Sequence, residues 1–259
     1  MIERLVPPQH RLGIFRPQPL LRIAGIAIGL ALMAWALLSP DSKDTAGDGG
    51  PDRAVTAAYE DWTATPPDQG ASRNALRVYA LSHPADEVAR SLVVARERGW
   101  DEGFVGQFTA IVAWAVSVRS AAPDSVYAQA QRALASAEAG TVTVGEALLA
   151  VAAQKGNLAA RLERAQRLID GAGAEEGWRT LGALAGGNDF APAQAELGRR
   201  YEQGDGVARD PQRALYWYLR ARDGGAEVHD RLGALQVSLP PAEREEAERW
   251  LAANTPPPD

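Results

Sequence analysis

One stretch of the chain, residues 193–225, constrains the fold more than any other. Its pattern predicts two short amphipathic helices joined by a tight turn. In the first helix Ala193, Leu197 and Tyr201 recur every four residues, so they share one helix face. A hairpin of two helices with one apolar edge cannot bury that edge alone, and it therefore needs neighbours of the same kind.

The turn and the second helix carry equally specific residues. Gly204 and Gly206 favour a reversal with positive φ angles, which side chains with a Cβ adopt only at a cost. Asp210 before a proline is typical of a helix start, and Gly224 follows the predicted helix end. The second apolar stripe has residues spaced three and four apart: Ala214, Trp217, Tyr218 and Ala221.

In this order the residues resemble the Sel-one-like repeat (SLR), a branch of the tetratricopeptide-like α-solenoids. The matching positions are Ala193, Leu197, Gly198, Tyr201, Gly204, Gly206, Val207, Asp210, Ala214, Trp217, Tyr218, Ala221 and Gly224. The resemblance implies a scaffold or adaptor for protein–protein contact, with no catalytic residues to carry over. It also implies a place in an assembly of the bacterial cell envelope, where such repeats are common.

Weaker copies of the repeat flank the clear one. Upstream, Trp178 is followed by Gly186 and Gly187 much as Trp217 is followed by its own glycines. Downstream, Leu232 begins a unit whose charged second helix surrounds Trp250 and is typical of a capping repeat. We therefore expect an all-α protein: one N-terminal membrane helix followed by an α-solenoid of about five helical hairpins.

The membrane helix is predicted at residues 20–38. Nineteen helical residues span about 28 Å, close to the hydrocarbon core of a bilayer, and Arg22 would lie at the interface. Arginines precede this segment and aspartates follow it. The positive-inside rule therefore leaves residues 1–19 in the cytosol and places the remainder in the periplasm, as a single-pass signal anchor in the inner membrane.

Two further features of this segment leave alternatives open. Ala34 and Ala36 satisfy the small-x-small rule, so cleavage near Ala36 would instead give a secreted or periplasmic protein. Gly25 and Gly29 have the spacing that lets two membrane helices pack closely, which would give a homodimer.

Beyond the anchor, the prediction is a flexible linker and then continuous helical structure. The mainly apolar run from Phe104 to Val118 has fifteen residues and contains Gln107 and Thr109, so it is too short and too polar for a second span. Residues 101–118 therefore predict a buried central helix. Another helix is predicted from Pro123 to Gly140. The expected divisions are a leader (1–19), an anchor (20–38), an acidic linker (39–52), a helical region without recognised repeat (53–140), SLR-like repeats (141–254) and a tail (255–259).

The chain shows no pattern that predicts catalysis, a metal or a cofactor. It has no cysteine, and His10, His83 and His229 are scattered. The net charge of −6 argues against a nucleic-acid partner. The acidic pairs at residues 101–102 and 175–176 stand at predicted helix starts, where carboxylates complement the helix dipole.

The leading functional hypothesis is a membrane-anchored, periplasm-facing scaffold or adaptor that assembles or regulates a bacterial envelope complex. Its partners would be envelope or inner-membrane proteins. The alternative is a cell-wall (peptidoglycan or polysaccharide) enzyme or sugar-binding protein with a helical cleft. That alternative requires a tryptophan exposed beside a carboxylate, at Trp62, Trp100 or Trp114.

A candidate protein-binding surface follows from the helix wheel of residues 193–203. Leu197 and Tyr201 form the inward stripe, which leaves four polar side chains on the outer face of the helix. We expect these to be exposed and available to a partner: Glu196, Arg199, Arg200 and Gln203.

Overall fold

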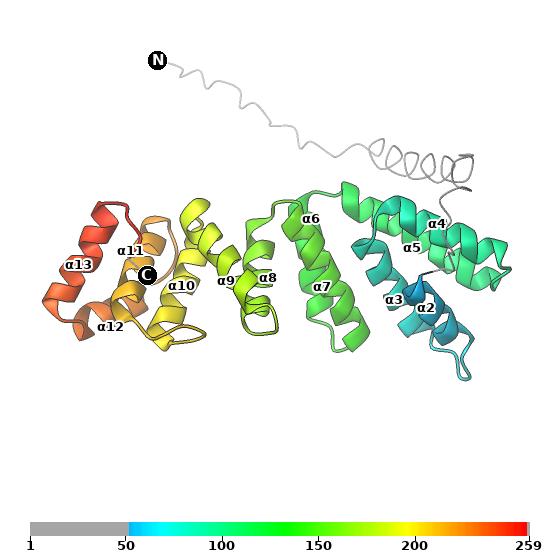
Figure 1. Cartoon of the computed structure of the whole chain (residues 1–259), viewed down its shortest axis with the longest axis horizontal. Helices are drawn as coiled ribbons and strands as arrows, with labels where there is room; N and C mark the ends of the chain where they lie inside the picture. Colours follow the sequence, from blue (N-terminus) through cyan, green and yellow to red (C-terminus); the bar gives the residue numbers. More distant parts are fainter. Residues whose placement is uncertain (1–51, 258–259) are drawn as a thin grey trace, which may run out of the picture. The chain divides into compact units, whose positions relative to one another are not determined.

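The computed structural model describes residues 52–257 and divides into two compact units between Ser120 and Ala121. Figure 1 shows helices only, and the described residues contain no strand, which confirms the all-α prediction for this part of the chain. The predicted leader and membrane helix lie outside the described residues. Within residues 52–257, no helix is both long enough and apolar enough to cross a bilayer.

The N-terminal unit contains four helices. Asp52 and Asp68 cap the first two, because their carboxylates accept backbone N–H groups of the first turn. The helices are α2 (Arg53–Thr63), α3 (Gln69–Ser82), α4 (Ala85–Glu97) and α5 (Glu102–Ser120). Helix α2 packs on α3, and both α3 and α4 pack on α5, which makes α5 the centre of the unit.

Helix α5 corresponds to the predicted central helix, but only one of its faces is buried. The buried side chains recur at helical spacing: Phe104, Phe108, Ile111, Val112, Ala115 and Val118. Small residues on the other face, such as Ala110 and Ala113, remain exposed. The high apolar content of this segment therefore comes from large core residues on one side and alanines on the other.

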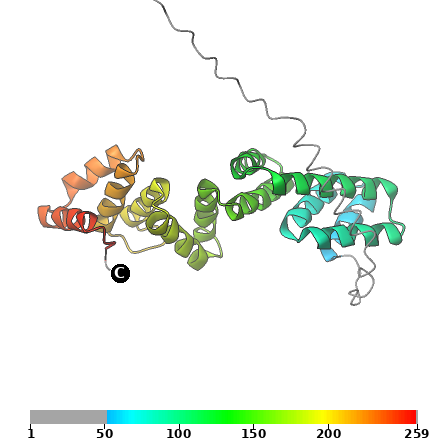
Figure 2. The same cartoon turned by 90° about the horizontal axis from the view of Figure 1, so that it is seen from above.

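The C-terminal unit begins with three successive helical hairpins. They are α6 (Pro123–Leu134) with α7 (Ala139–Gln154), α8 (Leu158–Ile169) with α9 (Ala174–Gly182), and α10 (Ala191–Gln203) with α11 (Pro211–Asp223). A short π-helical turn, Ala183–Gly187, extends α9. Helices α12 (His229–Ser238) and α13 (Pro241–Ala252) both pack against α11. Within this unit, Figures 1 and 2 show the hairpins following one another side by side, as in a solenoid.

One predicted helix end is wrong. Helix α6 ends at Leu134 and not at Gly140, which lies inside α7. The expected start of the SLR-like repeats at residue 141 lies within α7, and the two compact units separate at residue 120. The turn after Leu134 contains no glycine or proline to mark it, yet it brings α7 close to α6: a Cβ on Gly145 would lie 2.8 Å from the backbone nitrogen of Leu134. Helices α6 and α7 thus belong to one unit, although their sequence carries no repeat signature.

Candidate functional site

Close contact between α10 and α11 depends on a glycine facing a tyrosine. A Cβ on Gly198 would lie 2.7 Å from Cδ1 of Tyr218, so only a glycine lets the ring pack on this backbone. Trp217 is 8% exposed and Tyr218 is 1% exposed, which confirms that the aromatic stripe faces the core. The repeat alanines that flank it are fully buried: Ala193, Ala214 and Ala221.

The turn between these helices has the predicted backbone. Gly204 and Gly206 both have φ angles of +74°. A Cβ on Gly206 would lie 3.1 Å from the Trp178 ring, so the turn also packs against α9 of the preceding hairpin. The carboxylate of Asp210 accepts the backbone N–H of Arg213 at 2.9 Å and caps α11. The turn therefore connects the repeat to its neighbour as well as reversing the chain.

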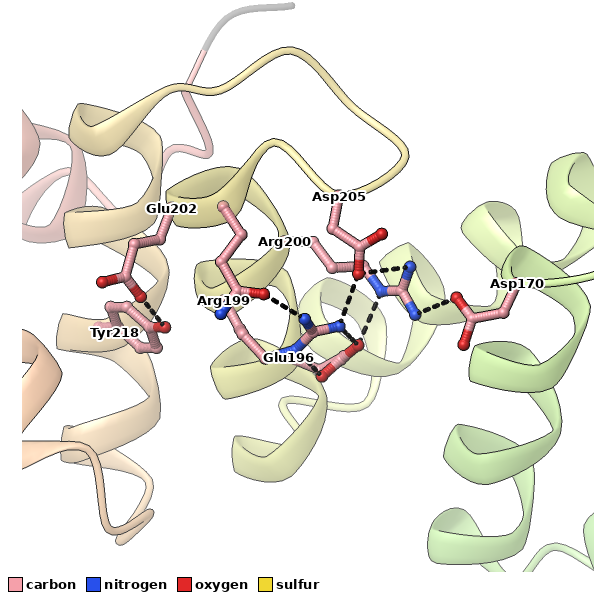
Figure 3. A network of polar contacts seen from close by, with 8 residues as sticks. Asp170, Glu196, Arg199, Arg200, Glu202, Asp205 and Tyr218 are labelled. Atoms are coloured by element: carbon pink, nitrogen blue, oxygen red, sulfur yellow. Dashed lines mark hydrogen bonds and ion pairs between the residues drawn. The ribbon is translucent and has the colours of Figure 1, made fainter.

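A buried arginine lies where the second and third hairpins meet (Figure 3). Arg200 is 1% exposed, and its Nε donates to Glu196 at 2.7 Å. Its Nη2 donates to Asp170, just after α8, at 3.0 Å, and its Nη1 lies 3.5 Å from Asp205 in the turn. The guanidinium carbon also lies 5.5 Å from the centre of the Trp178 ring. One cation thus holds α10, the end of α8 and the turn together.

Arg199 extends this network towards solvent. It donates to both carboxylate oxygens of Glu196, at 2.9 and 2.7 Å, to Gln203 at 2.6 Å and to Asp205 at 3.0 Å. Burial alone would raise the pKa of Glu196, but the hydrogen bonds from Arg199 and Arg200 outweigh it and lower that pKa. Hydrogen bonding to Glu196 in turn raises the pKa of Arg199.

A second small network joins α10 to the following helices. The Tyr218 hydroxyl donates to Glu202 at 2.7 Å, and Arg231 on α12 donates to the same carboxylate oxygen at 2.9 Å. Burial, reinforced by the Glu202 carboxylate, raises the pKa of Tyr218. The repeat is therefore linked by polar contacts to the helices on both of its sides.

The predicted exposure of the candidate surface is wrong for two of its four residues. Glu196 is 9% exposed and Arg200 is 1% exposed, because the preceding hairpin and the turn cover that side of α10. Gln203 is exposed and Arg199 is partly exposed. The side of α10 that remains accessible carries residues three and four apart: Pro192, Ala195, Arg199 and Gln203.

A small pocket of about 170 Å³ lies among α7, α8 and α9. Its lining combines small apolar residues with two arginines: Ala150, Ala153, Gln154, Arg161, Arg164, Ala165, Leu168 and Thr180. Arg164 pairs with Glu176 at 3.2 Å, whereas the side chain of Arg161 has no hydrogen bond or ion pair within the described part of the chain. Sequence reasoning missed this pocket, although Arg161 and Arg164 stand three apart on one helix, next to alanines of α7.

The tryptophans that the sugar-binding hypothesis requires are partly buried and packed. Trp62 donates from its indole nitrogen to Asp101 at 3.0 Å, and Trp100 stacks on Tyr59 with ring centroids 4.2 Å apart. The guanidinium carbon of Arg77 lies over the face of Trp114, 5.4 Å from its ring centre. Asp101 also accepts the backbone N–H of Phe104 at the start of α5, so its carboxylate has a structural role.

Comparison with known families identifies the repeat. The family model of the Sel1 repeat matches residues 191–225, the hairpin formed by α10 and α11. This match confirms the resemblance found in the sequence. Searches of curated proteins and of solved structures found no significant match to the chain.

Proposed function

We propose that this chain, which contains a Sel1 repeat, is a non-catalytic scaffold anchored in the inner membrane by residues 20–38. Its helical units face the periplasm, where they assemble or regulate a protein complex of the bacterial envelope. Sel1 repeats suggest protein interaction, and the stacked hairpins of the C-terminal unit support it. The apolar segment after a basic leader supports the anchor. Anchoring raises the effective concentration of the scaffold towards membrane proteins.

The proposed binding site for the partner is the pocket among α7, α8 and α9. Small-molecule sites usually enclose about 300–1,000 Å³. A pocket of about 170 Å³ is smaller, and is closer to the cavity of about 150 Å³ that holds a benzene-sized group. This space suits one side chain of a protein partner better than a whole metabolite.

The charge of the pocket selects the kind of side chain. Arg161 is partly buried and has no carboxylate partner among the described residues, while Arg164 already forms an ion pair with Glu176. A guanidinium binds a carboxylate through two parallel hydrogen bonds, which gives direction as well as affinity. An Asp or Glu of the partner, entering between α7 and α8, would complete this pairing. The partner segment would therefore be acidic at the point of contact.

Charge reversal in the pocket tests the proposal. The full-length chain would be captured from detergent-solubilised membranes with its partner, which is then purified for direct binding measurements. We expect Arg161→Glu to weaken the partner's affinity at least about tenfold, the loss that follows from replacing a charge-assisted bond by repulsion. Arg179→Glu is the matched control, since Arg179 is exposed on α9 and lies outside the pocket lining. Equal affinity for both variants would exclude the pocket as the binding site.

The anchor has a separate test. Residues 20–38 should keep the chain in the membrane fraction after an alkaline wash, and alkaline phosphatase fused to the C-terminus should be active because that end is periplasmic. A soluble chain with a new N-terminus near Ala36 would instead identify a cleaved leader. Retention in the membrane with an inactive fusion would contradict the proposed orientation.

A further inference from the structure

Three side chains with metal-binding atoms meet in the N-terminal unit. Asp52 precedes α2, His83 follows α3, and Glu87 lies in the first turn of α4. One ligand atom from each residue can be chosen such that all three atoms lie within 4.8 Å of one another. Nε2 of His83 lies 4.0 Å from Oδ2 of Asp52. All three residues are partly buried.

The imidazole of His83 is held in the orientation that metal-binding histidines use. Its Nδ1 lies 3.0 Å from the backbone carbonyl oxygen of Tyr79 and 3.0 Å from Oγ of Ser82, a hydroxyl that donates to the carbonyl oxygen of Val78. Because a carbonyl oxygen only accepts, this network assigns the proton to Nδ1, and Nε2 then presents its lone pair towards the carboxylates. The Tyr79 ring packs on the imidazole with centroids 4.2 Å apart and restricts its rotation. A backbone carbonyl on the second nitrogen is the usual outer partner of a metal-bound histidine.

The two carboxylates also leave oxygens available to a cation. Oδ1 of Asp52 accepts the backbone N–H of Ala54 at 2.7 Å as the cap of α2, whereas Oδ2 faces His83. Glu87 has no hydrogen bond or ion pair with another described residue. Two carboxylates directed at one place repel each other, and a divalent cation between them would remove that repulsion.

We propose that Asp52, His83 and Glu87 bind one divalent first-row transition-metal ion, with zinc as the best fit. One imidazole and two carboxylates form a three-residue ligand set that leaves a fourth tetrahedral position for water. Ligand atoms of zinc lie about 2.0–2.2 Å from the ion, so the three atoms must draw together slightly on binding. The side chain of Glu87 is free to make that movement. The ion would hold the start of α2 against the corner between α3 and α4, so that it stabilises the N-terminal unit.

Three conservative variants separate metal binding from folding. Asp52→Asn keeps an oxygen that caps α2. His83→Asn keeps a donor near the position of Nδ1 but has no Nε2. Glu87→Gln removes only the charge of a side chain that has no hydrogen bond or ion pair with another described residue. His229→Gln and His10→Gln are controls for zinc binding elsewhere, since His229 lies on α12 and His10 lies outside the described residues.

The experiment uses the full-length chain without a histidine tag, purified in detergent and stripped with EDTA. Calorimetric titration with ZnCl₂ should show one site per chain, zinc should raise the thermal midpoint, and Co²⁺ should give the visible absorption of a tetrahedral site. Each of the three variants should bind zinc at least about tenfold more weakly, while both controls bind as the parent chain does. Absence of saturable binding, binding that survives His83→Asn, or binding lost in His10→Gln would overturn the proposal.

Discussion

Arg200 on α10 and Asp170 just after α8 are joined by a hydrogen bond of 3.0 Å between a guanidinium and a carboxylate. The arginine is 1% exposed, whereas the side chain of the aspartate is 62% exposed. The contact between these two hairpins is therefore polar at its centre as well as apolar. Because a guanidinium forms directed hydrogen bonds, this pair helps to set the angle between the hairpins.

Replacing Arg200 should destabilise the protein strongly. Arg200→Met keeps much of the side-chain bulk but leaves Glu196 buried with one cation fewer. Removing one partner of a buried ion pair costs about 3–5 kcal/mol of unfolding free energy. The matched change Arg199→Met, at a side chain that is 29% exposed, should cost less, because Arg200 still pairs with Glu196 and water replaces part of the lost contacts. Unfolding of both variants, followed by circular dichroism, measures the difference, and similar losses would contradict the assigned roles.

Replacing glycine by alanine should have opposite effects on protein stability at Gly198 and at Gly233. Gly198→Ala would place a Cβ against the Tyr218 ring and should destabilise by about 1–3 kcal/mol, as overpacking does. Gly233→Ala lies within α12 with no atom within 4 Å of the added Cβ, so better helix propensity should stabilise by about 0.5–1 kcal/mol. An unchanged or higher thermal midpoint for Gly198→Ala would show that Tyr218 does not require the glycine, and a lower midpoint for Gly233→Ala would contradict the predicted stabilisation.

Stability should fall in acid partly through Glu196. Its folded-state pKa lies below the ordinary value of 4.5, so its contribution is complete above that pH and is lost as pH falls through the folded pKa. Glu196→Gln should therefore be less stable than the parent chain at pH 7, and the gap should narrow as the pH is lowered below 4.5. Unfolding midpoints of both proteins across this range test the sign. A gap that widens in acid would contradict it.

Removing the N-cap of α11 should lower the free energy of unfolding by less than the loss of Arg200 does. Asp210→Ala removes the acceptor of the Arg213 N–H group and should cost about 1 kcal/mol. Asp210→Asn keeps that acceptor, although it loses the charge that pairs with the Arg213 side chain, and should cost only a few tenths of a kcal/mol. An equal loss for the two variants would assign the effect to the ion pair instead of the cap.

Local patterns predicted the repeat hairpin well. The positions of Asp210, Gly204 and Gly206 could be predicted because caps and positive φ angles depend on neighbouring residues. The burial of Trp217 and Tyr218 followed from helical spacing, because a long apolar stripe is stable only when it is covered. The end of α6 was predicted wrongly, since no glycine or proline marks the turn after Leu134.

The amino-acid order was sufficient for the two helices of the repeat, the cap at Asp210 and their apolar faces, because those depend on contacts within a few residues. It could not show that Arg200 is buried, since a helix wheel does not reveal which neighbour covers the polar side. Asp170, Arg161 and the group of Asp52, His83 and Glu87 acquire their roles only when residues far apart in the chain approach. Charges and ligand atoms interact over a few ångströms of space, whatever the number of residues between them, and folding alone brings these groups within that range.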